Sequence, residues 1–410
     1  MDTMTIEPED LRLFTAAQIE APKLLLAPAG RLPVIAFVDA QTEQLLQEAS
    51  VLSGRNLIVR GGIAKAIEYL NEQRSPNLLL VDISGVELPL SQIQMLGDVC
   101  EPGTNVIAIG DRNDVALYRD LQRAGVTDYL VKPLTRDLLT KALAPGTDGS
   151  GSDMGRAPLK LGKMVSFIGA RGGVGTTTLA ANLAWYLANQ QSRRVALADL
   201  DIQQGDCNLL FNVTTTPGLR HALANPLRLD PLLLERIMTK HGERLFVLGG
   251  QEPIQDHVQF TTDAIDTLFT VLRSQFHYVI ADVPRIPIPA YRRALEIADR
   301  RIIVVDQTMR SMRDAMRLKR MLGDDADRSI FVVNRMGEAG NHGLSLKEIG
   351  DTLQAKPTGT IPFLPRLVTP AAHHATIAAS QRKFATGIGT LALEISGHTR
   401  RRRWFSWRAK

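Results

Sequence analysis

The residues best suited to do chemistry lie in one stretch, 167–182, which reads FIGARGGVGTTTLAAN. An apolar run typical of a strand leads into a cluster of glycines, and an apolar run typical of a helix follows three threonines. Such a connection can cradle a phosphate, because backbone N–H groups and the positive end of the helix dipole point at the same anion. We therefore predict a phosphate-binding loop, the alternative being a glycine-rich connection without a ligand. Its expected contact residues are Arg171, Gly172, Gly173, Val174, Gly175, Thr176, Thr177 and Thr178.

The loop departs from the common phosphate-loop pattern G-x-x-x-x-G-K-[ST] at two positions. Ala170 stands at the first glycine and Thr176 at the lysine, whereas Gly175 and Thr177 match. Thr177 can place its hydroxyl on Mg²⁺. The missing ammonium removes transition-state stabilisation, by analogy with the ~3–4 kcal/mol lost with one oxyanion donor. We therefore expect a nucleotide to bind through backbone amides and Mg²⁺, without fast hydrolysis.

The same stretch resembles KGGVGKTT, the deviant phosphate loop of the ParA/MinD-type ATPases. In that family the first lysine reaches across a nucleotide-sandwich dimer, and the second holds the β- and γ-phosphates. The resemblance places Arg171 at the first position, where a guanidinium keeps the positive charge, and Thr176 at the second. It implies a homodimer that binds ATP (or ADP) and Mg²⁺, with Arg171 as a catalytic candidate.

Further motifs support this resemblance over residues 163–395. Asp201 ends the run ADLD, which is similar to the family's D-x-D, and matches a carboxylate that orients the attacking water or the metal shell. Asp282 lies in YVIADVP, which looks like the family's Walker B strand, and would hold the Mg²⁺ shell. Asn334 and Arg335 are similar to the adenine-side pair, and Pro362 lies in a TIP run similar to the later base-contacting loop. A strand that ends in Asp is common, so the order and spacing of the motifs carry the assignment.

Residues 33–144 resemble a response-regulator receiver domain. The matches are Asp39 after the first strand-like run, Asp82 after the third and Lys132 after the last. In receivers a carboxylate cluster holds Mg²⁺, a central Asp accepts phosphate and the Lys pairs with it, so Asp82 would be the acceptor. Ala40 replaces the usual second acid, and Gly110 replaces the Thr or Ser that couples phosphorylation to a change of shape. We expect a receiver-shaped docking or dimerisation module; the alternative for Asp82 is a strand-end carboxylate in solvent.

Two basic segments are candidate surfaces. In the segment 309–322, arginines at 310, 313, 317 and 320 share one face of a predicted helix. Arg313 and Arg317 could bind an acidic partner or nucleic acid, and Arg313 begins an RDA run similar to one in the MinD branch; the alternative is a solvated face. The tail reads RRRRWFSWRAK, in which arginine is attracted to anionic lipid and tryptophan prefers the interface. It is a candidate peripheral membrane anchor or a disordered basic end; its residues are Arg400, Arg401, Arg402, Arg403, Trp404, Phe405 and Trp407.

The elements that position these residues follow an α/β pattern. Apolar runs typical of buried strands lie at 34–38, 78–81, 106–109, 129–131, 164–168, 195–198, 245–248, 278–281, 302–305 and 330–333. Helical spacing lies between them, as at 41–52 and 114–124, and a last helix runs to about 395. This alternation predicts two doubly wound, mainly parallel sheets. The expected parts are an N-terminal extension (1–32), a receiver or flavodoxin-like domain (33–144), a Gly/Ser-rich linker (145–160), a deviant P-loop NTPase domain (161–396) and the tail (397–410).

Composition excludes several classes of protein. The chain has 410 residues, 44% hydrophobic and 22% charged, as in globular proteins. No apolar run approaches the ~20 residues of a membrane span. Its two cysteines, Cys100 and Cys207, suggest neither a disulfide framework nor a metal site, so we expect a cytoplasmic protein. The net charge of +5 comes largely from the tail, which argues against a nucleic-acid partner.

An atypical receiver joined to a lysine-deficient ParA/MinD-like domain resembles the CpaE/TadZ family of the Tad (Flp, type IVc) pilus machinery. The resemblance implies a localisation or assembly factor that partners with pilus proteins at the inner membrane face or cell pole. One alternative is an active ATPase that cycles on a membrane or partner surface, and another is a DNA-partition ATPase. Whether the chain is an enzyme stays open at this point.

Overall fold

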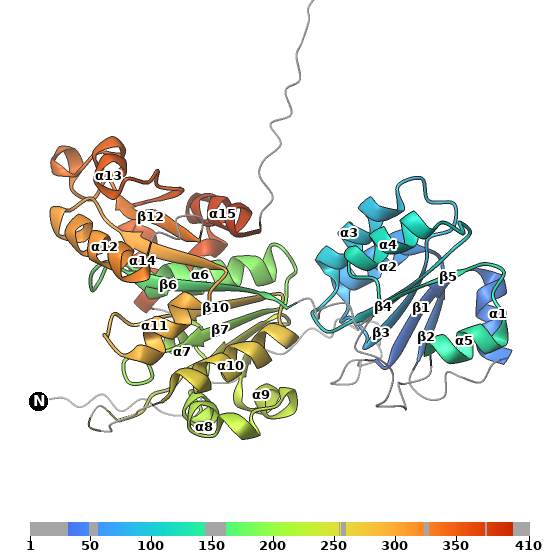
Figure 1. Ribbon diagram of the computed structural model, residues 1–410. Coiled ribbons are helices and arrows are strands. Elements are labelled where there is room, and N and C mark those ends of the chain that lie inside the picture. The colour runs from blue at the N-terminus through green and yellow to red at the C-terminus, as the bar shows by residue number, and fades with distance from the viewer. Residues whose placement is uncertain are drawn as a thin grey trace, which may run out of the picture. The chain divides into compact units, whose positions relative to one another are not determined.

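The computed structural model describes residues 32–48, 56–143, 161–253, 255, 260–323, 328–373 and 375–396 (Figure 1). The predictions made for the N-terminal extension, the linker and the tail lie outside these residues. Among the described helices, none is both long and apolar enough to cross a membrane.

The first sheet has five parallel strands in the order β2-β1-β3-β4-β5. This order is that of flavodoxin-like folds. The strands are β1 (Val34–Val38), β2 (Leu57–Arg60), β3 (Leu78–Asp82), β4 (Asn105–Gly110) and β5 (Asp128–Val131). The helices are α1 (Ala40–Glu48), α2 (Ile63–Glu72), α3 (Pro89–Val99), α4 (Val115–Arg123) and α5 (Arg136–Leu143). The apolar cores show that α2, α3 and α4 cover one face of the sheet and α1 and α5 the other.

The second sheet has eight strands in the order β13-β12-β11-β6-β10-β7-β9-β8, and only β8 is antiparallel to its neighbour. The strands are β6 (Lys163–Gly169), β7 (Val195–Asp199), β8 (Thr239–His241), β9 (Leu245–Leu248), β10 (Tyr278–Asp282), β11 (Arg300–Val305), β12 (Ser329–Met336) and β13 (Gly359–Pro362).

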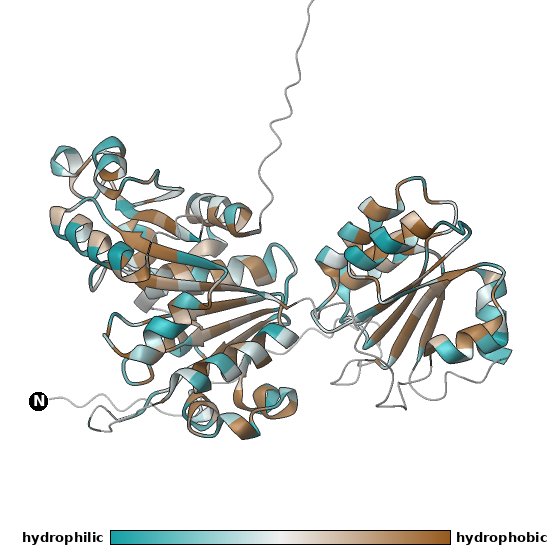
Figure 2. Cartoon of the chain, viewed as in Figure 1, coloured by the Kyte–Doolittle hydropathy of each residue, from teal (hydrophilic) through white to brown (hydrophobic). Residues whose placement is uncertain are grey.

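Helices cover both faces of the second sheet. The helices on one face are α8 (Gly218–Ala224), α9 (Pro231–Ile237), α10 (Thr262–Gln275), α11 (Pro289–Glu296), α12 (Met309–Leu322) and α13 (Leu346–Leu353). Those on the other are α6 (Thr176–Asn189), α7 (Cys207–Leu210), α14 (Pro365–His373) and α15 (Arg382–Ser396). Figure 2 shows the central strands as nearly continuous apolar runs, which is the pattern of parallel strands buried on both faces.

The predicted α/β fold with parallel sheets is confirmed, and each predicted strand is present within a few residues of its expected bounds. Three strands were not predicted. β2 lies at the edge of the first sheet, while β13 and β8 lie at the two edges of the second. The sequences GTIP and TKH carry too few apolar residues to stand out, because an edge strand is covered less than a central one.

Candidate functional site

The connection between β6 and α6 forms an open loop. Gly173 and Gly175 have φ angles of 74° and 92°, a backbone conformation that favours glycine. A Cβ built on Gly172 or Gly173 would meet nothing within 4 Å, so this side of the loop faces open space. Gly175 is the N-cap of α6 and offers the helix no side-chain hydrogen bond. The first amides of α6 are therefore available to an anion, and the loop fits a phosphate.

Asn334 holds the loop from the adjacent part of the sheet. Its side chain is only 7% exposed, and Nδ2 donates to the carbonyl of Val174 at 2.8 Å. A Cβ on Gly175 would lie 2.4 Å from this Nδ2, which gives a second reason for glycine at that position. Asn334 lies where a register shift between Val333 and Met336 interrupts the pairing of β12 with β13. The predicted base-side Asn334 therefore contacts the phosphate loop itself.

The other two residues predicted on the base side lie near the ends of β12 and β13. Arg335 has a φ of 53°, and its Nη1 lies 3.4 Å from Oε1 of Glu338. Pro362 is exposed and pairs in register with Met336.

Arg171 and Thr176 occupy the two family lysine positions in different ways. Nε of Arg171 donates to Oδ2 of Asp306 at 2.8 Å, Nη2 donates to the same oxygen, and Nη1 donates to the carbonyl of Gly172 at 3.0 Å. Asp306 is buried, and its Oδ1 accepts from the Thr308 hydroxyl at 2.6 Å. A Cβ on Gly169 would lie 2.4 Å from the Thr176 hydroxyl, so that hydroxyl packs back toward the end of β6.

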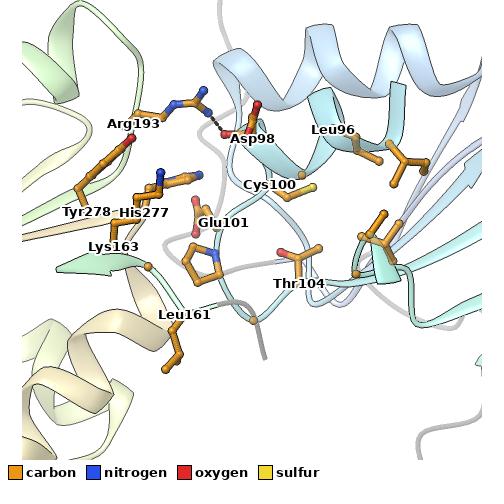
Figure 3. A pocket seen from close by; sticks show the side chains of 18 of the residues that line it. Leu96, Asp98, Cys100, Glu101, Thr104, Leu161, Lys163, Arg193, His277 and Tyr278 are labelled. Atoms are coloured by element: carbon orange, nitrogen blue, oxygen red, sulfur yellow. Dashed lines mark hydrogen bonds between the residues drawn. The ribbon is translucent and has the colours of Figure 1, made fainter. Parts of the chain in front are cut away.

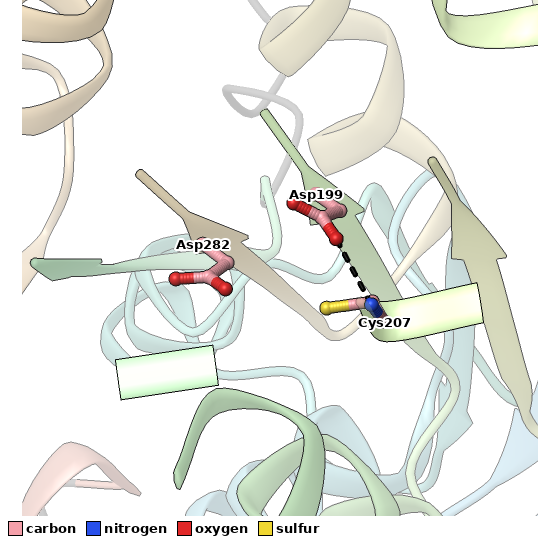
Figure 4. A group of neighbouring side chains, drawn as sticks. All are labelled: Asp199, Cys207 and Asp282. Atoms are coloured by element: carbon pink, nitrogen blue, oxygen red, sulfur yellow. Dashed lines mark hydrogen bonds between the residues drawn. The ribbon is translucent and has the colours of Figure 1, made fainter. Parts of the chain in front are cut away.

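Two carboxylates meet where β7 and β10 end (Figure 4). Asp199 and Asp282 are register partners, and together with the Cys207 thiol their donor atoms lie within 4.8 Å of one another, all buried. Burial, followed by repulsion from Asp199, raises the pKa of Asp282 to about 8, although a hydrogen bond with Thr177 works in the opposite direction. Burial likewise raises the pKa of Asp199 to about 6. A cation placed here would relieve the cost of ionising both groups.

The structure therefore brings together Asp282 and Thr177, two of the residues predicted to hold the metal shell. Asp201 lies just outside this group: it is half-buried, and its Oδ1 accepts from the backbone of Gln204 at 3.0 Å. Asp199 instead organises the turn, since it accepts from the backbone N–H groups of Asp201 at 3.2 Å and Cys207 at 3.0 Å. Cys207, which the sequence did not link to these carboxylates, lies beside them because helix α7 returns to the end of β7.

Two more residues near the loop were not predicted. Asn182 joins the first turn of α6 to the segment before α15, since its Nδ2 donates to Thr178 O at 2.7 Å and its Oδ1 accepts from Ala379 N at 2.6 Å. Arg285 donates through Nη1 to the carbonyl of Ala170 at 3.0 Å. No sequence motif marks either one, and each makes one contact with a residue more than 100 positions away.

The first sheet brings its three predicted residues together. Lys132 Nζ lies 2.7 Å from Asp39 Oδ2 and 2.6 Å from Asp82 Oδ2. Burial opposes ionisation of Asp39, but hydrogen bonds from Lys132 and Thr42 outweigh it and lower the pKa of Asp39 to about 2. Asp82 is buried, so the alternative of a strand-end carboxylate in solvent is wrong.

The helix α12 carries the predicted basic face. The arginines at 310, 313, 317 and 320 are all exposed, whereas Met312 and Ala315 on another face are buried. Asp314 lies buried beside them and accepts from Arg313 Nε at 3.0 Å. The tail arginines and aromatic residues lie outside the described part of the chain.

Some residues labelled in Figure 3 lie elsewhere on the second sheet. Lys163 and Tyr278, labelled there, are the first residues of β6 and β10. They therefore lie at the amino ends of these strands, and the phosphate loop and the carboxylates lie at the carboxyl ends. His277 lies beside them, and burial lowers its pKa to about 4. These residues are therefore separate from the site built by the loop and the carboxylates.

Comparison with known proteins agrees with this geometry. A model of the CobQ/CobB/MinD/ParA nucleotide binding domain matches residues 165–377, just over half of the chain. An uncharacterized ATP-binding protein of Methanocaldococcus jannaschii is 29% identical over 157 residues, which are 38% of this chain and 57% of that protein. The septum site-determining protein MinD of Bacillus subtilis is 28% identical over 203 residues, 47% of this chain and 70% of that protein. The chain thus spans little more than half the length of the first of these relatives.

Solved structures show the same fold. A ParA family ATPase from Chlorobium tepidum superposes with a TM-score of 0.52 at 19% identity, over 57% of this chain and 98% of that chain. The pilus assembly protein CpaE from Caulobacter crescentus is 34% identical and covers 28% of this chain and 91% of that chain, with a TM-score of 0.26. The ParA likeness establishes the fold of the second sheet and its helices, whereas the TM-score of the CpaE likeness is too low to establish a common fold.

Proposed function

Because the chain belongs to the CobQ/CobB/MinD/ParA nucleotide binding domain family, we propose that it binds ATP with Mg²⁺ as a dimer and hydrolyses it slowly or not at all. In this proposal the amides of residues 172–177 hold the phosphates, while Thr177 and Asp282 hold the Mg²⁺ shell. Mg²⁺ would neutralise phosphate charge when bound. Asp201 orients water or the metal shell, and the segment around Arg335 and Pro362 faces the base.

The observation that carries the proposal is an open phosphate loop without its lysine. The loop has glycines at the positive φ angles and free amides at the start of α6. Thr176 offers only a hydroxyl, which packs toward Gly169. Binding through amides survives this change, whereas stabilisation of the charge that develops during phosphoryl transfer is weakened.

The test is to measure equilibrium binding of Mg-ATP and steady-state turnover for the natural chain and for Thr176→Lys. We expect tight binding with negligible turnover in the natural chain, and faster turnover in Thr176→Lys because an ammonium reaches the phosphates. Gln190→Lys is the matched control, since it adds the same charge at the exposed far end of α6. Brisk turnover in the natural chain would favour the cycling ATPase instead, and lack of binding would refute the nucleotide site.

We propose further that this chain acts as a localisation or assembly factor of a Tad (Flp, type IVc) pilus system in the cytoplasm, at the inner membrane face or pole. Support comes from the combination of a lysine-deficient loop with a five-stranded flavodoxin-like sheet that carries Asp39, Asp82 and Lys132 together. Deleting the gene in its own host should abolish pili, and expression of the natural chain should restore them. Unchanged piliation would refute this role, and tight DNA binding at physiological salt would favour the partition alternative.

A further inference from the structure

Two arginines flank Ala170, the first residue of the phosphate loop, and they differ in how their charge is balanced. Arg171 is matched one to one: both Nε and Nη2 donate to a single oxygen of the buried Asp306. Its Nη1 donates to the Gly172 carbonyl at 3.0 Å. The charge of Arg171 is therefore compensated by Asp306. Three of its five N–H groups already donate, to Asp306 or to the Gly172 carbonyl.

Around Asp314 the balance is reversed. This one buried carboxylate lies within 3.4 Å of Arg285 Nη1, 3.0 Å of Arg313 Nε and 3.6 Å of Arg317 Nη1. One negative charge faces three positive charges, so the group carries a surplus of positive charge. A surplus beside a phosphate loop attracts an anion, and the attraction is strongest where the cation is partly screened from water.

Arg285 is the member of this group that contacts the loop. Its Nη1 donates to the Ala170 carbonyl at 3.0 Å as well as to Asp314. The turn that carries it is tight, since Ile286 N donates to Pro284 O and Ile288 N donates to Ile286 O, each at 2.9 Å. The turn follows directly from β10, which ends at Asp282. Arg285 is therefore held on a tight turn three residues after Asp282.

The guanidinium of Arg285 retains donors for a ligand. Both hydrogen bonds that the described part of the chain shows for it come from Nη1, and the side chain is 45% exposed. Nε and Nη2 form the planar fork that suits two oxygens of a phosphate. The amides that cradle phosphates lie at the α6 end of the loop, whereas Arg285 lies at the Ala170 end. A phosphate chain that runs along the loop from α6 toward Ala170 would bring its terminal phosphate nearest to Arg285.

We propose that Arg285 binds the terminal phosphate of a nucleoside triphosphate in this loop. The inference rests on the proposed nucleotide-binding function and adds a residue that selects triphosphate over diphosphate. Asp314 is then a positioning residue. It holds the Arg285 guanidinium at Ala170, and its single negative charge does not neutralise the three arginines around it.

The test compares the dissociation constants of Mg-ATP and Mg-ADP, measured by calorimetry on the full chain and its variants. Arg285→Gln removes the charge and keeps a side-chain N–H donor for the Ala170 carbonyl, so the fold is preserved. We expect it to weaken Mg-ATP at least 10-fold and Mg-ADP less than 3-fold, while Arg285→Lys recovers most of the loss. Arg292→Gln is the matched control, because Arg292 is an exposed arginine of α11 that pairs with Glu296 at 2.7 Å.

The outcomes separate this inference from the function on which it rests. Equal weakening of both nucleotides, or unchanged binding of both, in Arg285→Gln would refute a role at the terminal phosphate while leaving the nucleotide site in place. A natural chain that binds neither nucleotide would refute the proposed function itself. Thermal melting of each variant shows whether a loss of binding is a loss of folding, and in that case Arg285→Lys decides: its Mg-ATP affinity must stay near that of the natural chain.

Discussion

The contact between Asn334 and the phosphate loop can be tested by removing one hydrogen bond. Nδ2 of Asn334 donates to Val174 O at 2.8 Å, and both residues are buried. Asn334→Ala leaves that carbonyl without its donor, which costs about 1–3 kcal/mol in the free energy of unfolding. If about 2 kcal/mol of this is needed to restore the loop for binding, the dissociation constant of Mg-ATP rises roughly 30-fold. Asn334→Asp should reduce stability and Mg-ATP affinity further, because the side chain keeps its shape but places a carboxylate oxygen against the Val174 carbonyl oxygen.

Chemical denaturation and nucleotide titration of the same samples provide the measurement. Asn189→Ala is the control: its Nδ2 also donates to a backbone carbonyl, that of Trp185 at 3.0 Å, but at the exposed far end of α6. The control should change stability by less than about 0.5 kcal/mol and binding not at all. The reasoning fails if Asn334→Ala unfolds at the same denaturant concentration as Asn189→Ala and binds Mg-ATP equally well.

Two further predictions concern buried groups. The pKa of Asp282 is about 8 in the folded chain against an ordinary 3.8, so the folded state holds a proton that the unfolded state releases; without Mg²⁺, this group alone should lower stability as pH rises from 4 to 8, by up to about 1.4 kcal/mol per pH unit. Asp282→Asn should flatten this slope in urea titrations, and a slope equal to that of the natural chain would contradict the assignment. In the first sheet, a Cβ on Gly110 would lie 2.3 Å from the Tyr129 hydroxyl, so Gly110→Ala should destabilise by about 1–3 kcal/mol. Gly350→Ala, where the nearest atom is 3.7 Å away, should be neutral or stabilising in thermal melts; equal melting temperatures for the two variants would refute the overpacking argument.

Much of the fold was predictable because parallel strands buried on both faces are written as uninterrupted apolar runs. The carboxyl ends of those strands also carry the chemistry, so Asp282 and the phosphate loop could be found from the sequence. The edge strands β8 and β13 could not, because a strand covered on fewer sides needs fewer apolar residues. The third edge strand, β2, reads LIVR and was missed although it is apolar. Apolar runs therefore locate the central strands of a sheet more reliably than its edge strands.

The site was less predictable because its polar contacts join distant parts of the chain. The sequence resemblance indicates that Asn334 belongs near the nucleotide, but only the structure shows its bond to Val174, 160 residues earlier. Cys207 carries no motif, and its place beside Asp199 depends on how the turn after β7 returns through Gly205, where a Cβ would lie 2.4 Å from Asp199 Oδ2. Such closeness depends on backbone geometry and not on residue spacing.

The role that the resemblance implies for Arg171 has an energetic cost in this chain. To reach across a dimer, the guanidinium must leave Asp306, which is buried and would then keep an unpaired charge. Removing one partner of a buried pair typically costs about 3–5 kcal/mol. A dimer contact must therefore exceed that cost, or another cation must take the place of Arg171 at Asp306. Arg285 faces no such cost, because Nε and Nη2 can bind a phosphate while Nη1 stays at Ala170 and Asp314, and Asp314 also keeps Arg313 and Arg317. Of the two arginines at the loop, Arg285 is the one that can bind a phosphate without leaving a buried carboxylate alone.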